Sequence, residues 1–206
     1  MNDVGVAVGV VPLEARGTLP LAELHGEPMF LHPVRALLRS GGLDRVVVTA
    51  DDPSAATPYL PRRLHVDVLT AQEFWAGVDQ TVVLADPLCP LLPADFVARV
   101  VEEAAGSAVA GYRPVTDTVK TVVDQRITGT LDRDRLAVVA SPVVVPAALA
   151  KQRPPVDDFA RLAAWLRERG DLRLVKAPSM ARRVGDESAL RVLECLDELA
   201  HRVQEA

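Results

Sequence analysis

The feature that most constrains this sequence is an apolar run near its start, from Val4 to Val11, which Pro12 closes. A strand with no polar face is typical of a parallel sheet that is covered on both sides. Similar valine-rich runs recur at residues 45–49, 66–69, 81–85, 108–110 and 172–175. Because segments with helical spacing separate these runs, the sequence predicts an α/β fold: a mostly parallel sheet with helices on both faces.

Four segments carry apolar side chains at the spacing of an amphipathic helix. They cover residues 29–40, 93–105, 157–170 and 186–199. Gly41 and Gly170 are suitable helix stops, Pro93 suits a first helical turn, and an acidic residue at 157 or 158 suits a cap. The proline-rich stretch at 53–61 is expected to be a surface loop.

The segment 116–145 interrupts this alternation, because it shows little helical periodicity. Two short alternating runs flank a polar turn at residues 124–126, which predicts a protruding β-hairpin arm at about 114–145. A lone hairpin is marginally stable in water, so we expect the arm to find a partner. With no internal repeat or long linker, residues 1–206 are expected to form a single domain.

Composition narrows the function classes. The net charge of −5 and a pI of about 5.4 argue against a nucleic-acid-binding surface. No apolar run is long enough to span a membrane, and the start of the chain lacks the basic flank of a signal peptide. Cys89 and Cys195 form no ligand cluster, and the four histidines lack metal-ligand spacing. We therefore expect a cytoplasmic protein that binds neither nucleic acid nor a membrane.

Four segments, in order along the chain, carry a family resemblance. They are residues 24–30 with the helix at 34–38, residues 82–90, residues 114–120 leading to 130–133, and residues 183–190. The third is the most specific, since it places Asp117, Thr118 and Lys120 ahead of Thr130 and Arg133. The chain resembles the bacterial cytidylyltransferases that attach CMP to methylerythritol phosphate, and their relatives that act on ribitol phosphate.

This resemblance implies a Rossmann-like sheet, an arm that makes a homodimer, and a site at the carboxyl ends of the strands. It implies CTP and a polyol phosphate as substrates in isoprenoid precursor synthesis, with Mg²⁺ as cofactor. The residues that it assigns to catalysis are Arg16, Lys120, Arg133 and Arg183. It assigns Pro12, Gly17 and Asp86 to the nucleotide, Asp86 also to the metal, and Asp117 and Thr118 to the acceptor.

The expected phosphate loop, residues 11–22, departs from the family pattern. It holds one glycine, Gly17; Leu21 stands where the family has a lysine; and Glu14 adds a negative charge where the triphosphate is expected. Cys89 stands where the family has an arginine, and we interpret it as a small buried residue. The family resemblance implies a Gly-Gly-x-x-Arg helix that holds the cytosine base. Residues 70–79 occupy the place of this helix but lack its glycines and its arginine.

Several roles stay open on the sequence alone. Asp86 is either a ligand for magnesium or ribose or a turn residue before a proline. Lys120 and Arg133 either contact phosphate or are surface charges of the arm. Phe74 and Trp75 either stack on a base or cover the sheet.

Two hypotheses follow from these departures. The chain is either an active nucleotidyltransferase or a catalytically inactive relative that acts as a binding or regulatory partner. The shape of the loop from Pro12 to Leu21 discriminates between them, because a transferase needs a positively lined cleft beside Asp86.

Overall fold

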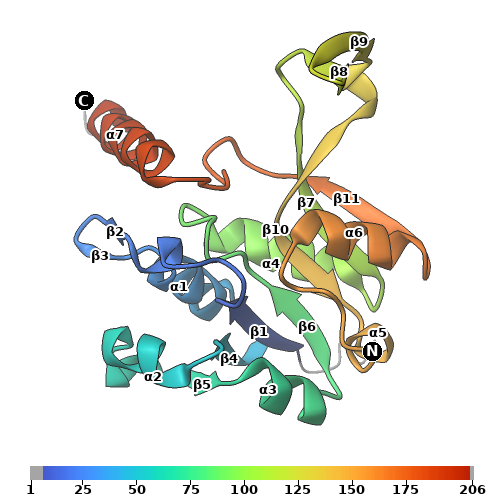
Figure 1. Cartoon of the computed structure of the whole chain (residues 1–206). Helices are drawn as coiled ribbons and strands as arrows, with labels where there is room; N and C mark the ends of the chain where they lie inside the picture. The colour runs from blue at the N-terminus through green and yellow to red at the C-terminus, as the bar shows by residue number, and fades with distance from the viewer. Residues whose placement is uncertain (1–6, 205–206) are drawn as a thin grey trace.

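The computed structural model describes residues 7–204 and shows one seven-stranded sheet (Figure 1). The strand order is β11-β7-β10-β6-β1-β4-β5. The bounds are β1 Ala7–Pro12, β4 Leu43–Thr49, β5 Asp67–Leu69, β6 Thr81–Leu84, β7 Ala108–Pro114, β10 Ala137–Val145 and β11 Leu172–Lys176. Only β10 runs antiparallel to its neighbours β6 and β7 in this sheet. The expected mostly parallel sheet is therefore confirmed.

The first strand is apolar because both of its faces are covered. Every residue of β1 is buried, whereas Val4, Gly5 and Val6 of the expected run lie outside the described residues. α1 (Leu31–Ser40) and α4 (Ala94–Ala104) bury Val34, Leu37, Phe96 and Val100 against one face. The opposite face carries α3 (Ala71–Gly77), α5 (Ala147–Ala150) and α6 (Phe159–Arg167).

Helix α3 decides the role of the two adjacent aromatic residues. Thr70 and Glu73 form a capping box that starts this short helix. Phe74 and Trp75 are 3% and 8% exposed and pack against the core beneath the sheet, with their rings edge to face. They cover the sheet and are not free to stack on a base.

The proline-rich stretch expected as a loop contains a short helix instead. α2 (Pro53–Ala56) begins because the Asp52 carboxylate accepts from the Ser54 N–H, with Pro53 preset for the first turn, and a 3-10 turn, Thr57–Tyr59, follows. Both elements are short, so the stretch still serves as a connection between β4 and β5.

The expected hairpin arm projects away from the sheet, above β7 and β10 in Figure 1. β8 (Val119–Val123) pairs antiparallel with β9 (Arg126–Leu131), and Asp124 and Gln125 form the turn with positive φ angles. β10, the last part of the range 114–145, belongs to the main sheet. The arm exposes the apolar side chains of Val122, Val123 and Ile127, which are 58–69% accessible.

The last helix, α7 (Glu187–Gln204), lies beside the main layers (Figure 1). It packs on the small hairpin of β2 (Glu23–Leu24) and β3 (Glu27–Pro28), where Leu190 and Leu193 are buried with Leu24. Leu196 and Leu199 are exposed, so within the described residues only the first half of the expected leucine face is buried. Within residues 7–204, no helix has both the length and the apolar character needed to cross a membrane.

Candidate functional site

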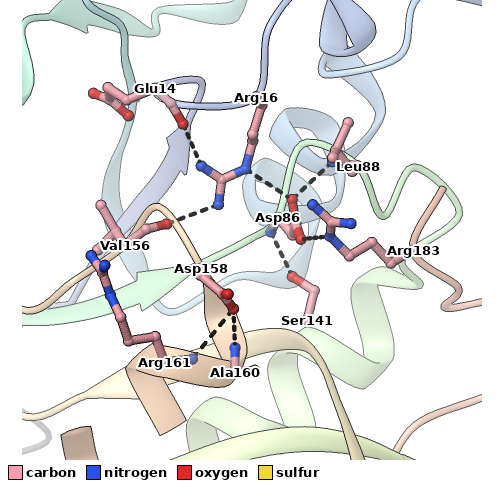
Figure 2. A network of polar contacts seen from close by, with 10 residues as sticks. All are labelled: Glu14, Arg16, Asp86, Leu88, Ser141, Val156, Asp158, Ala160, Arg161 and Arg183. Carbon is pink, nitrogen blue, oxygen red and sulfur yellow. Dashed lines mark hydrogen bonds and ion pairs between the residues drawn. The ribbon is translucent and has the colours of Figure 1, made fainter. Parts of the chain in front are cut away.

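Asp86 is the centre of the site and lies two residues after the end of β6, at the carboxyl edge of the sheet. Its Oδ1 lies 3.2 Å from Arg16 Nε, and its Oδ2 lies 3.0 Å from Arg183 Nε (Figure 2). The Leu88 N–H also donates to Oδ1, at 3.1 Å, and the Asp86 N–H donates to Ser141 Oγ, at 2.8 Å. The carboxylate is thus buried, with both of its oxygens held by guanidinium groups.

The side chain of Arg16 is held by three separate segments of the chain. Beyond its bond to Asp86, Nη1 donates to the Glu14 carbonyl at 2.7 Å and Nη2 donates to the Val156 carbonyl at 2.8 Å. Its guanidinium also lies 5.8 Å from the centre of the Phe159 ring, within cation–π range. These contacts bury the side chain and fix it as a structural cation between the loop after β1 and the start of α6.

Arg183 is the more accessible partner. It comes from the segment between β11 and α7, and its side chain is 53% exposed. Only its Nε contacts Asp86, and within residues 7–204 its terminal nitrogens make no hydrogen bond, so they are available for a further anion. The Val184 N–H donates to the Leu88 carbonyl at 2.7 Å, which ties this segment to the loop that carries Asp86.

Cys89 follows Asp86 by three residues and is buried in the core together with residues of α1 and α4. Burial, with a contribution from the negative charge of Asp86, raises the pKa of its thiol to about 12. A thiol with this pKa is not a nucleophile near neutral pH. The interpretation of Cys89 as a small buried residue is confirmed.

A cavity of about 780 Å³ opens beside Asp86 and lies between α6, β10 and β11. Arg16, Asp86 and Arg183 line one end of it. Ligand sites in open α/β sheets occur at this carboxyl edge, and this volume is in the usual range for small-molecule sites. The side chains of Leu13, Leu19 and Leu21 do not line this cavity.

The loop after β1 is closed by apolar packing. Leu13 and Leu21 pack against the core on the α1 face, and Leu19 packs against the cluster beneath α7. Gly17 takes a positive φ of 58° and turns the chain, as does Ala15 at 59°. Leu21, in the place of the family's lysine, therefore contributes to the core and supplies no charge to the site.

Glu14 is the unusual residue of this loop. Both of its carboxylate oxygens are buried, and neither accepts a hydrogen bond within residues 7–204. Burial raises the pKa of its carboxyl group above the ordinary value. Because the Glu14 side chain does not line the cavity, its charge does not face a ligand bound there.

The arm residues lie apart from this network. Lys120 Nζ donates to Thr130 Oγ1 at 2.6 Å, and Arg133 Nη1 donates to the Thr116 carbonyl at 2.6 Å. Asp117 and Thr118 are exposed, and none of the four predicted arm residues lines the cavity. Within residues 7–204, the structure brings Arg16, Asp86 and Arg183 into contact. The predicted arm residues Lys120, Arg133, Asp117 and Thr118 lie outside this network.

The site also contains groups that sequence reasoning missed. Ser141 and the Val156 carbonyl belong to segments 55 and 140 residues away from their partners, and a main-chain carbonyl has no sequence signature. Arg135 and Arg167 line the cavity as well. Their charge is visible in the sequence, but their convergence on one cavity is not.

The contacts of Asp86 do not favour it as a magnesium ligand. In the described part of the chain, no three His, Cys, Asp or Glu side chains are grouped so that they could hold a metal. The oxygens of Asp86, the expected ligand, already face two guanidinium groups. A cation of charge +2 placed there would be repelled by both arginines.

The sheet order, the antiparallel strand β10, the projecting hairpin and the charged cavity at the carboxyl edge define a Rossmann-like α/β protein with a ligand-sized site. The sequence profile of the 2-C-methyl-D-erythritol 4-phosphate cytidylyltransferase family matches residues 16–153. The chain belongs to this family.

Individual relatives agree with this assignment. The chain is 30% identical to the 2-C-methyl-D-erythritol 4-phosphate cytidylyltransferase of Rhodococcus jostii over 214 aligned positions, which cover 94% of this chain and 92% of the relative. The protein of the same name from Bordetella parapertussis is 33% identical over 171 positions, covering 70% and 75%.

Solved structures show the same fold at lower identity. The 4-diphosphocytidyl-2C-methyl-D-erythritol synthase of Anaerococcus prevotii superposes with a TM-score of 0.76 at 14% identity, covering 95% of this chain and all of that chain. The 2-C-methyl-D-erythritol 4-phosphate cytidylyltransferase of Thermus thermophilus superposes with a TM-score of 0.73 at 20% identity, covering 92% and 98%. The predicted Rossmann-like fold is confirmed.

Proposed function

We propose that this protein is a cytoplasmic cytidylyltransferase that transfers CMP from CTP to a polyol phosphate of the methylerythritol phosphate type, in isoprenoid precursor synthesis. The observation that carries the proposal is the Arg16–Asp86–Arg183 network beside a cavity at the carboxyl edge of the sheet. It occurs in a chain of the cytidylyltransferase family.

In this proposal the protein acts by positioning and by neutralising charge, as is general for phosphoryl transfer. Arg183 contacts a phosphate through its unused terminal nitrogens, since only Nε is bound to Asp86. Asp86 and Arg16 are positioning residues: the buried pair holds the guanidinium of Arg183 at the mouth of the cavity. Pro12 and Gly17 shape the loop that faces the nucleotide.

We further propose a homodimer through the β8–β9 arm. The exposed apolar side chains of Val122, Val123 and Ile127 support it, because a two-stranded arm is marginally stable alone. In such a dimer, Asp117, Thr118, Lys120 and Arg133 serve the acceptor site of the second copy. Because both oxygens of Asp86 are bound by arginines, we propose that a divalent cation, if the reaction uses one, would enter with the phosphates of CTP.

The test is a direct assay of the purified protein with CTP, magnesium and 2-C-methyl-D-erythritol 4-phosphate. We expect pyrophosphate release and a cytidine diphosphate product by mass spectrometry. Arg183→Ala should lose turnover, whereas Arg191→Ala, another exposed arginine on the neighbouring helix α7, should keep it. Absence of the product with the folded wild-type protein would reject the transferase proposal.

A second candidate function is ligand binding without turnover. Two observations favour it: Leu21 packs against the core where the family has a lysine, and the Glu14 carboxylate, which accepts no hydrogen bond within residues 7–204, lies in the nucleotide loop. Calorimetric titration with CTP, combined with the product assay above, separates the two functions. Binding of CTP with no product in the assay above supports this candidate, and turnover rejects it.

A further inference from the structure

The last helix, α7, packs on the apolar cluster that also holds both chain segments of the Asp86–Arg183 contact. Leu88 lies two residues after Asp86, and Val184 directly follows Arg183. Both side chains are buried in one cluster with two leucines of α7. The Val184 N–H donates to the Leu88 carbonyl at 2.7 Å, which joins the two segments. The position of α7 is therefore coupled to the main chain on both sides of the contact.

The connection from Arg183 to α7 is short. Four residue steps separate Arg183 from Glu187, the first residue of the helix, and they span at most about 14 Å. The Asp186 carboxylate accepts from the Ala189 N–H at 2.7 Å, so the first turn of the helix is fixed to this connection. A movement of the start of α7 therefore shifts the main chain of Arg183.

His25 fixes α7 at a second point. It lies in the turn between β2 and β3, the small hairpin next to α7 in Figure 1. Its main-chain N–H donates to Glu194 Oε1 at 2.9 Å, and its Nε2 lies 3.0 Å from Asp197 Oδ2. Glu194 and Asp197 are three residues apart and share one face of the helix. The buried leucines alone would let α7 pivot about them, whereas this second contact sets the direction of the helix.

Arg183 needs this support more than Arg16 does. The Arg16 guanidinium is buried, and it is bonded to Asp86 and to two main-chain carbonyls. Arg183 is half-exposed, and among the described residues its side chain is bonded to Asp86 alone. The entropy lost by fixing an arginine side chain is comparable with the gain from one half-exposed ion pair. The Arg183 guanidinium therefore stays on Asp86 only if its main chain is already in place.

We propose that His25 is a positioning residue for the site: it fixes α7 on the β2–β3 hairpin and so keeps the Arg183 guanidinium on Asp86. The proposal rests on the proposed function only for the phosphate that Arg183 then contacts. His25 does not line the cavity beside Asp86, so it acts through α7 and not on a ligand there.

The first test follows the Arg183 Nε–H group by NMR of the ¹⁵N-labelled full chain, with the signal assigned by its loss in Arg183→Lys. The double variant His25→Gly, Glu194→Ala removes the imidazole and the carboxylate that join the hairpin to α7. Glycine suits the positive φ of 51° at residue 25, and both positions are exposed, so the variant should fold normally. We expect its Arg183 Nε–H to exchange with water about tenfold faster than in the wild-type protein.

Two further variants separate positioning from a general effect on α7. Glu194→Gln keeps an oxygen that accepts from the His25 N–H, and it should retain most of the protection. Glu198→Ala removes an exposed carboxylate that pairs with Arg202 on the same helix, and it should leave the exchange rate unchanged. An unchanged exchange rate in the double variant would overturn the proposal.

The second test is calorimetric titration with inorganic pyrophosphate, in the wild-type background and in Arg183→Ala. The double variant should weaken binding about tenfold in the first background and not at all in the second, because His25 acts through Arg183. Equal weakening in both backgrounds, or no binding of pyrophosphate to the wild-type protein, would also overturn the proposal. The NMR readout needs no substrate, so it is independent of the turnover that tests the transferase proposal.

Discussion

Replacing Glu14 with glutamine should stabilise the protein at neutral pH. Burial of the Glu14 carboxylate disfavours its charged form. Its oxygens are buried, and no hydrogen bond reaches them within residues 7–204. The hydroxyl of Thr49 is also buried and has no hydrogen-bond partner within residues 7–204. It lies close enough to Glu14 to offset part of the rise in the pKa of the Glu14 carboxyl group. A glutamine amide has the same shape, carries no charge and can donate to that hydroxyl.

The magnitude follows from the cost of an unsatisfied buried group, about 1–3 kcal/mol. We expect Glu14→Gln to raise the free energy of unfolding at pH 7 by this amount. For a chain of this size the melting temperature should rise by about 2–4 °C per kcal/mol. Glu23→Gln, at an exposed position in the short hairpin after the loop, is the control and should change neither quantity.

The gain should depend on pH with a definite sign. Burial raises the pKa of the folded Glu14 carboxyl above its ordinary value of 4.5. Below that value both the folded and the unfolded chains are protonated, and the carboxyl costs nothing. As the pH rises through 4.5 towards the folded pKa, the unfolded chain ionises first, so the wild-type protein loses stability. The advantage of Glu14→Gln should therefore be small near pH 4.5 and should grow towards pH 7.

Urea unfolding of the wild-type protein and both variants, at intervals from pH 4.5 to pH 8, measures this difference. A destabilised Glu14→Gln variant would show that the carboxylate has a stabilising partner. A stability gain that is the same at every pH would show that ionisation of Glu14 is not its cause. Either result would refute the reasoning.

Three further predictions concern the packing around the site. Arg16→Ala should cost about 3–5 kcal/mol in urea unfolding, because it leaves a buried carboxylate with one cation. Arg183→Ala, at a half-exposed position, should cost about 1 kcal/mol or less, and equal costs would contradict the difference in burial. Gly111→Ala should cost about 1–3 kcal/mol, because an added Cβ would lie 2.8 Å from a backbone oxygen of β10, whereas Gly77→Ala meets no atom within 4 Å and should be tolerated. Asp158→Ala should lower the melting temperature through the loss of the α6 cap, worth about 0.5–2 kcal/mol, and an unchanged melting temperature would show that the cap is dispensable.

Much of the fold could be predicted from the sequence, because strand and helix periodicity are local properties. The apolar run that contains β1 and the helical spacing of α1, α4 and α6 follow from which faces must be buried. The alternation around Asp124 and Gln125 likewise predicts the hairpin β8–β9. The site was predicted less completely: the resemblance named Arg16, Asp86 and Arg183, but not the partners that hold them.

Two residues show what local pattern cannot decide. Trp75 was compatible with stacking on a base or with covering the sheet, and only the packing of α3 places it in the core. Leu21 was visible as a missing lysine, but its burial against the core on the α1 face depends on how the loop after β1 closes.

The sequence by itself determined the α/β class, the family and the residue types available at the carboxyl edge of the sheet. The tertiary structure alone decided that the Asp86 carboxylate is bound by two arginines, one 70 and the other 97 residues away, and that this network lines a cavity at the carboxyl edge of the sheet. The physical reason is that periodicity records which face of an element is buried. Pairing between distant charges depends on the order of strands and the packing of helices, which no local pattern encodes.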